Sequence, residues 1–245
     1  ARLSTRINSR DLSVSFEKNN LMIKDIPLKF TGKFLFEKEG YRVNLNLLSV
    51  LEKEFFSARF RIVQGRSTWV SAKVNASLDL GRWSKALDVK TVDLKGLYEL
   101  NLDAEGNYAT GPDPGRLRKD TVLLSIPRFT LMTRLAGGYM KYASLPQPIS
   151  HINFALNVSC PDSNYRNIQV HVKDLQADFL KNRIRGHFDI SSLRDMPVEA
   201  ELEGNCNLGE LRQVIPLDST ELAGSLDFRI NVKGNYAPEK KLFPH

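Results

Sequence analysis

Residues 94–108 read LKGLYELNLDAEGNY, and apolar residues occupy every second position of its central part. Tyr98, Leu100, Leu102 and Ala104 are separated from one another by charged or amide residues. Side chains alternate between the two faces of a β-strand, so this pattern predicts a strand with one apolar and one polar face.

The same period of two recurs along nearly the whole chain. Fully buried parallel strands would read as continuous apolar runs, whereas alternation is typical of antiparallel sheets with one solvated face. We therefore predict a mainly all-β fold, built on a mostly antiparallel sheet with one dry face. Alternation extends over residues 12–16, 28–36, 41–47, 56–62, 70–80, 152–160, 168–172, 198–208 and 226–232.

The chain also contains an internal repeat at a distance of 128 residues. Residues 222–236 read LAGSLDFRINVKGNY, which matches the first stretch in pattern and in its Gly-Asn-Tyr end. Aligning residues 80–109 with 208–237 gives eight identities in 30 positions, so chance is a poor explanation. A repeat at a fixed distance predicts two copies of one structural unit. We assign residues 1–110 to the first unit, 111–120 to a linker loop rich in Gly and Pro, and 121–245 to the second.

Each copy is expected to contain one short helix. Asp79 and Asn207 are good N-caps, and apolar residues follow them at helical spacing. We predict helices near 80–89 and 208–216, which dock on the dry face of the sheet as lids. Gly96 and Gly224 predict a bulge or a close approach by the helix. The predicted apolar helix positions are Leu80, Trp83 and Leu87, then Leu208, Leu211 and Ile215.

Composition excludes several classes of protein. The 245 residues contain two cysteines, too few for a disulfide scaffold, and no apolar run long enough for a membrane helix. The net charge of +7 fits anionic partners without naming one. Basic clusters at 116–119, 183–185 and 240–241 fit a solvated surface, or head-group contact at a groove rim. They lack the dense basic stripe with interleaved aromatics of nucleic-acid binders, so we expect no nucleic-acid partner.

Residue patterns of catalysis and metal binding are missing from the sequence. It has no Gly-x-Ser-x-Gly elbow, no phosphate-binding loop and no spaced Cys/His set. His171 and His187 fall at polar or mixed strand positions, which favours solvated histidines. Cys160 and Cys206 fall in the apolar phase, as buried thiols or as a disulfide pair. We expect a protein that is not an enzyme, with no catalytic residue, metal or cofactor.

The two repeated segments resemble the AsmA-like family, the repeat-built β-rich proteins related to AsmA and TamB of Gram-negative envelopes. The resemblance is clearest at Leu80–Tyr108 and Leu208–Tyr236. It implies an elongated, curved sheet with an apolar inner groove. It also implies a periplasmic protein, anchored to the inner membrane by a segment outside residues 1–245, that supports lipid supply or assembly of the outer membrane. Phospholipid or another envelope lipid, and outer-membrane assembly proteins, are the partners it implies.

The dry face allows two interpretations. Exposed apolar area costs about 25 cal/mol per Å², and two short helices cannot cover it, so either the sheet closes on itself or acyl chains cover the face. In the first case the protein is an interaction module that recruits envelope proteins through its edge strands. In the second it holds or conducts lipid with little side-chain specificity. The candidate lipid-groove residues are Tyr98, Leu100, Leu102, Leu226, Phe228 and Ile230.

Overall fold

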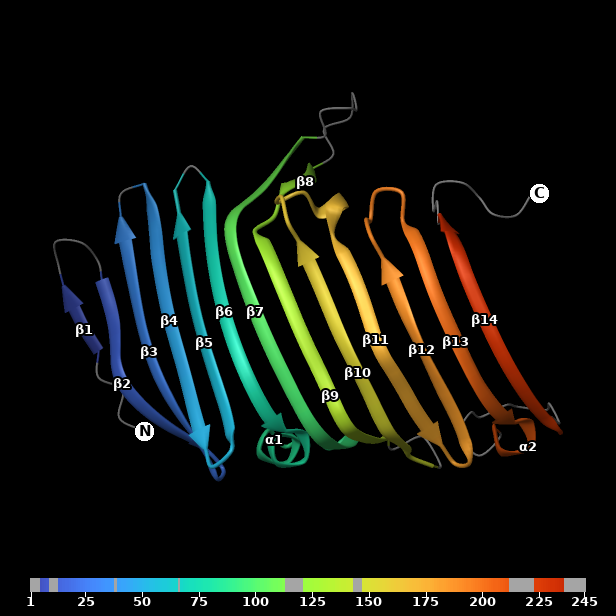
Figure 1. Ribbon diagram of the computed structural model, residues 1–245. Helices are drawn as coiled ribbons and strands as arrows, with labels where there is room; N and C mark the ends of the chain where they lie inside the picture. The colour runs from blue at the N-terminus through green and yellow to red at the C-terminus, as the bar shows by residue number, and fades with distance from the viewer. Residues whose placement is uncertain are drawn as a thin grey trace. The chain divides into compact units, whose positions relative to one another are not determined.

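The computed structural model describes residues 5–8, 13–37, 39–65, 67–112, 121–142, 147–211 and 223–235. Strands dominate it (Figure 1). The elements are β1 (Thr5–Asn8), β2 (Ser13–Ile23), β3 (Ile26–Glu37), β4 (Gly40–Leu51), β5 (Glu54–Gln64), β6 (Thr68–Asp79), α1 (Leu80–Ala86), β7 (Val92–Pro112), β8 (Thr121–Ser125), β9 (Arg128–Tyr142), β10 (Ile149–Cys160), the 3-10 turn η1 (Tyr165–Asn167), β11 (Gln169–Phe179), β12 (Asn182–Ile190), β13 (Pro197–Asn207), α2 (Leu208–Leu211) and β14 (Ser225–Asn235).

The strands follow one another in the order β1-β2-β3-β4-β5-β6-β7-β9-β10-β11-β12-β13-β14, and β8 pairs with β7 outside this path. Every strand pair whose register is described is antiparallel. The predicted all-β, antiparallel fold class with two short helices is therefore confirmed. Neither described helix has the length or hydropathy to cross a membrane.

The chain folds as two compact units. The first comprises Ala1–Asp79, Tyr98–Met132 and Ser159–Tyr165, and the second comprises Leu80–Leu97, Thr133–Val158 and Arg166–His245. The predicted boundaries at residues 110 and 121 remain a prediction. Of the predicted linker 111–120, residues 113–120 lie outside the described residues, while Gly111 and Pro112 belong to β7 and pair with β8.

In the first unit, the register of β3–β6 collects apolar side chains on one face. Phe30 is opposite Leu47, which is opposite Ala58, which is opposite Val74. Neighbouring rows run Gly32, Leu45, Phe60, Ala72 and Phe34, Val43, Ile62, Val70. The period-two pattern of the sequence therefore becomes a continuous apolar surface because the hairpin registers keep all four strands in phase.

The 128-residue repeat reappears as matching elements. β4, β5 and β6 of the first unit correspond to β11, β12 and β13 of the second, and α1 corresponds to α2. The hairpin turns also match, since Glu52 and Leu180 both adopt a left-handed conformation, with φ of 51° and 55°. The repeat is thus one of backbone conformation as well as of residue type.

One hydrogen bond recurs at equivalent positions of both copies. The backbone N–H of Asp79 donates to Oε2 of Glu54 at 3.0 Å, and the N–H of Asn207 donates to Oδ1 of Asn182. In each copy, the side chain of the first residue of β5 or β12 accepts a hydrogen bond from the backbone N–H of the last residue before the helix. Buried Asn182 also donates through Nδ2 to the carbonyl of Phe179 at 3.1 Å, which ties the hairpin turn to the helix start.

Both helices begin where the sequence predicts, and α1 is shorter than the predicted 80–89. α2 is capped by Asn207, whose Oδ1 accepts from the N–H of Gly209 at 3.0 Å. α1 ends in a Schellman motif: the left-handed Asp88 donates to Lys85, and Val89 donates to Ser84. The prediction that Leu87 packs under the helix is wrong, because Leu87 is exposed and Ala86 is the buried residue. Residues 212–216 of the second predicted helix lie outside the described residues.

A bulge in β11 keeps its apolar residues on one face. Val172 is opposite Phe188 and Leu175 is opposite Gly186, so Lys173 and Asp174 of β11 correspond to the single residue His187 of β12, and β11 holds one extra residue. Asp174 has a φ of 53°. The apolar residues of β11 shift phase between Val172 and Leu175, and without the bulge half of them would turn to the polar face.

Glycines permit a close approach between β7 and β9. A Cβ on Gly96, whose φ is +124°, would lie 2.9 Å from the Cα of Gly138. Gly96 therefore lies at a close approach, but the predicted approach by the helix is wrong, because the neighbour is strand β9. A Gly-Gly pair such as Gly137–Gly138 favours irregular structure. Instead β9 continues to Tyr142 as a long strand, with Gly137 in a left-handed conformation.

We predict that Asn182→Ala lowers the free energy of unfolding by about 1–3 kcal/mol, because it removes a buried amide that bonds the N–H of Asn207 and the carbonyl of Phe179. Urea denaturation followed by circular dichroism measures the change. Asn231→Ala, at an exposed position of β14, is the control and should stay within about 0.5 kcal/mol of the parent. Equal stability of the two variants would contradict a structural role for the repeated contact.

Candidate functional site

The strongest candidate site is the apolar face of strands β11–β14. Its central row runs from Leu175 through Gly186 and Leu202 to Ile230. Two parallel rows are Ala177, Ile184, Gly204, Phe228 and Val172, Phe188, Ala200, Val232. No charged side chain occupies any of these positions, so the four strands present one uninterrupted hydrocarbon surface within the second unit.

This face is shielded mainly by its own strand neighbours. On β14 the exposed fractions are 49% for Leu226, 48% for Ile230 and 47% for Val232. Of the three rows, no residue falls into the fully buried class. A second packed layer would bury most of these side chains, since interiors are close-packed. The apolar face therefore retains area that another apolar partner can cover.

Phe228 and Gly204 form a special pair on this face. They are directly opposite in the β13–β14 register, and a Cβ on Gly204 would lie 2.9 Å from Cζ of Phe228. The phenyl ring of Phe228 therefore lies over Gly204. The ring covers the backbone at this position, where the glycine has no side chain of its own. Of the three predicted groove residues on β14, Phe228 is the half-buried one, and Leu226 and Ile230 are exposed.

The other three predicted residues, Tyr98, Leu100 and Leu102, lie on β7 in the first unit. All three are half-buried, whereas the residues between them are exposed. The polar neighbours mark the opposite face: Nδ2 of Asn101 donates to Oδ1 of Asn75 at 2.7 Å. The structure thus brings together Tyr98, Leu100 and Leu102 in one unit, and Leu226, Phe228 and Ile230 in the other.

A surface hollow of about 860 Å³ lies over the second unit, and the sequence analysis does not identify it. Polar side chains dominate its lining, which includes Asp178, Arg183, Glu203 and Arg229 beside Phe228. These residues are far apart in sequence and meet only through the register of β11–β14. No local motif could have revealed the hollow, because each strand contributes one or two ordinary charged residues.

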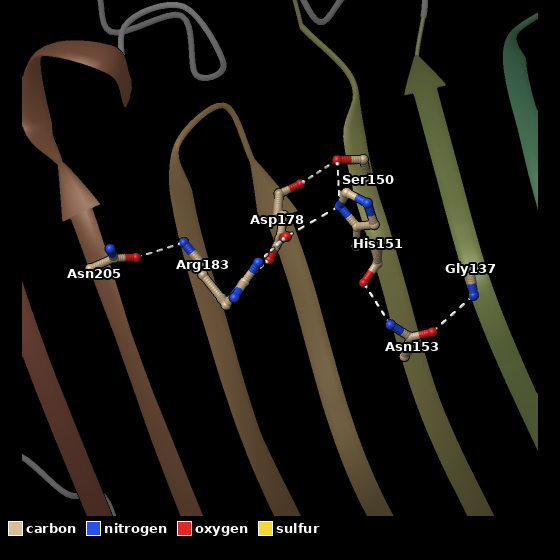
Figure 2. A network of polar contacts seen from close by, with 7 residues as sticks. All are labelled: Gly137, Ser150, His151, Asn153, Asp178, Arg183 and Asn205. Atoms are coloured by element: carbon tan, nitrogen blue, oxygen red, sulfur yellow. Dashed lines mark hydrogen bonds and ion pairs between the residues drawn. The ribbon is translucent and has the colours of Figure 1, made fainter.

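Asp178 is the centre of the polar contacts at this hollow (Figure 2). Arg183 donates from Nε to Oδ1 at 2.8 Å and from Nη2 to Oδ2 at 2.9 Å, a bidentate pair. Nδ1 of His151 lies 3.2 Å from Oδ2. The Asp178 side chain is only 11% exposed and that of Arg183 is 50% exposed, so the buried carboxylate has a solvated counter-ion.

The network continues on both sides of Asp178 through backbone groups. Arg183 donates its own N–H to Oδ1 of Asn205 at 2.8 Å. On the other side, Asn153 joins two irregular backbone positions, donating to the carbonyl of His151 at 3.0 Å and accepting from the N–H of Gly137 at 2.8 Å. His151 has a φ of 48°, so Asn153 and Asp178 together hold a strained position of β10.

The electrostatics of this cluster favour charge pairing. Hydrogen bonds from Arg183 hold the pKa of Asp178 below its usual range, against the opposing effect of burial. A hydrogen bond from Arg229 likewise lowers the pKa of Glu203. Nη2 of Arg229 lies 2.6 Å from Oε2 of Glu203. A general acid needs a raised pKa, so these carboxylates are better suited to structural ion pairs.

Cysteines and histidines show no cluster of ligands. Cys160 and Cys206 are both free thiols, and burial raises the pKa of Cys160. His171 pairs with Asp189 at 2.6 Å on the polar face. Among the described residues, no group of three His, Cys, Asp or Glu is placed to hold a metal ion. The basic clusters 116–119 and 240–241 lie outside the described residues. In the third cluster, 183–185, Arg183 pairs with Asp178.

Comparison of the chain with protein-family models, curated proteins and solved structures gives no match. The surfaces described above are therefore the basis for inferring a function, and the resemblance to the AsmA-like family remains an expectation from the repeated segments.

We predict that Asp178→Asn lowers the free energy of unfolding at neutral pH by roughly 1.5–3 kcal/mol, the range for hydrogen bonds to charged groups. Because the folded pKa is lowered, the stabilisation is present above the unfolded value of about 3.9 and is lost as the pH falls through the folded pKa. The difference in free energy of unfolding between parent and variant, measured by urea denaturation, should thus be smaller at pH 2.5 than at pH 7. Asp227→Asn, which removes an exposed carboxylate of the same face, is the control; a gap independent of pH would contradict the ion-pair assignment.

Proposed function

We propose that the protein is a non-enzymatic lipid-holding protein of the cell envelope, whose apolar sheet face carries acyl chains. The observation that supports this most strongly is the open row of β11–β14, with side chains on β14 that remain about half exposed. Acyl chains have no polar atoms to recognise, so a continuous hydrocarbon surface without charges suits them. Their binding would be driven by buried area, at about 25 cal/mol per Å².

The setting of this proposal comes from the resemblance to the AsmA-like family. In that setting the chain lies in the periplasm, is anchored to the inner membrane by a segment outside residues 1–245, and supports outer-membrane biogenesis. Phospholipid or another envelope lipid is the ligand, and outer-membrane assembly proteins are further partners. The charge-paired state of Asp178 and Glu203 is consistent with a role other than catalysis.

A second candidate is an interaction module that recruits envelope proteins through an edge strand. β14 ends the order of described strands, and every residue of it except Phe228 is exposed. Edge strands offer unpaired backbone groups for strand addition. This candidate requires a closed core, however, and the half-exposed apolar rows favour the lipid-holding proposal.

The decisive variant is Ile230→Asp, with Asn231→Asp as its matched control. The two variants introduce the same charge at adjacent positions of one exposed edge strand, on opposite faces. A charge on the apolar face opposes contact with acyl chains, so Ile230→Asp should weaken binding of a fluorescent phospholipid by about tenfold or more. Asn231→Asp should bind like the parent. Urea denaturation of both variants separates lost binding from lost folding.

The same comparison applies in the first unit with Leu100→Asp and Asn101→Asp. Native mass spectrometry of protein purified from an envelope fraction provides an independent measurement, since the proposal expects co-purifying phospholipid. Protein that is free of lipid and does not bind labelled phospholipid would favour the edge-strand module. If Leu100→Asp changes neither lipid retention nor stability, the face assigned to β7 is wrong.

A further inference from the structure

The second face of strands β3–β6, opposite their apolar rows, carries a basic surface. One row runs Thr31, Asn46, Arg59, Lys73, and the next runs Lys33, Asn44, Arg61, Ser71. The flanking rows are Leu35, Arg42, Val63, Trp69 and Lys29, Leu48, Ser57, Asn75. We call this surface the basic face; its cations are Lys29, Lys33, Arg42, Arg59, Arg61 and Lys73, and all of them are exposed.

No Asp or Glu occupies any position of these four rows. The acidic residues of the same phase, Glu37 and Asp79, come at strand ends. Lys73 pairs with Asp103 of β7 at 3.3 Å, with both side chains well exposed. Within the described part of the chain, Lys29, Lys33 and Arg59 have no ion-pair partner.

Two of the cations are placed where they oppose each other. Arg59 and Lys73 are direct cross-strand neighbours, and like charges at such positions destabilise a sheet. The equivalent pair of the second unit, 128 residues later, is His187 and Glu201, and Arg61 corresponds to Asp189. The same scaffold therefore folds with acidic residues in place of Lys73 and Arg61. The cations are not required by the fold, and a bound anion would relieve their repulsion.

Exposed apolar side chains accompany the cations at one end of the basic face. Val50 is opposite Phe55 beside the β4–β5 turn, Leu48 lies in the next row, and all three are exposed. Cations with adjacent apolar residues suit a membrane interface, where cations contact anionic head groups and apolar groups enter the acyl boundary. A single-stranded nucleic acid would need stacking platforms, and the one indole of this face, Trp69, is covered by Arg61, whose Cζ lies 5.4 Å from the ring centroid.

We propose that the basic face of β3–β6 docks on a bilayer surface that contains anionic phospholipid. This contact is separate from the acyl-chain contact of the apolar face, because it uses other residues: the polar-phase residues of β3–β6 in place of the apolar rows of β11–β14. It supplies a place for the head groups of a membrane, whereas the apolar face takes hydrocarbon.

The test uses the full chain and sedimentation with vesicles of phosphatidylcholine, either pure or with one third phosphatidylglycerol. The parent should bind the anionic vesicles and release them as salt is raised. The double variant Arg59→Gln with Lys73→Gln should weaken this binding roughly tenfold or more, and removal of a like-charge pair leaves folding intact. Arg229→Gln with Lys233→Gln is the matched control: it removes the same charge from the polar face of the second unit and should bind nearly as the parent does.

A second variant separates a membrane from a polyanion. Val50→Ser with Phe55→Ser should weaken vesicle binding without changing its salt dependence, because it removes only apolar contact. Equal binding to neutral and anionic vesicles, or an equal loss in both charge variants, would overturn the proposal. Binding of single-stranded DNA or heparin without binding of anionic vesicles would also overturn it. Phospholipid retention on the apolar face is measured separately with Ile230→Asp, so either proposal can fail alone.

Discussion

Cross-strand register is the constraint on which the rest of this structure depends. Side chains alternate along a strand, so a slip of one residue would move every apolar side chain to the polar face. The bulge at Lys173 and Asp174 shows how closely this is maintained, because one extra residue in β11 brings Leu175 onto the same face as Val172. Both candidate surfaces follow from this one constraint. The apolar face collects hydrocarbon, and the opposite face is left free to vary in charge.

The freedom of the polar face is visible between the two repeats. At positions 128 residues apart, the first unit places Lys73 where the second places Glu201, with little change in the strands beneath. In the second unit the charges are balanced by pairs such as Arg183 with Asp178 and Arg229 with Glu203. On β3–β6 of the first unit the charges within the four rows are all basic. One scaffold thus presents a self-neutralised surface in one copy and a cationic surface in the other, which suggests that the copies have diverged in their contacts.

Much of the fold is predictable from the residues alone. Alternation identifies the strands, and the repeat identifies β6 and β13, the helix starts at Leu80 and Leu208, and the cap at Asn207. These features are local or periodic, so they can be predicted from the sequence without knowing which strands pair. The errors also have physical causes. Leu87 has helical spacing, but the Schellman motif ends the helix before it and turns it to solvent. The Gly137–Gly138 pair suggests irregular structure, but β9 uses Gly138 for a close approach to Gly96 and remains a strand.

The sequence by itself determined the class of the protein: alternating strands with one apolar face, a twofold internal repeat and a short helix in each copy. Periodicity suffices for this, because the face of a side chain depends only on its parity along a strand. Only the tertiary structure decided which side chains meet. The Asp178 network, the cover of Gly204 by Phe228 and the carboxylate-free rows of the basic face all join residues from different strands. Their meeting depends on the pairing register, which turns and bulges set and which no single segment contains.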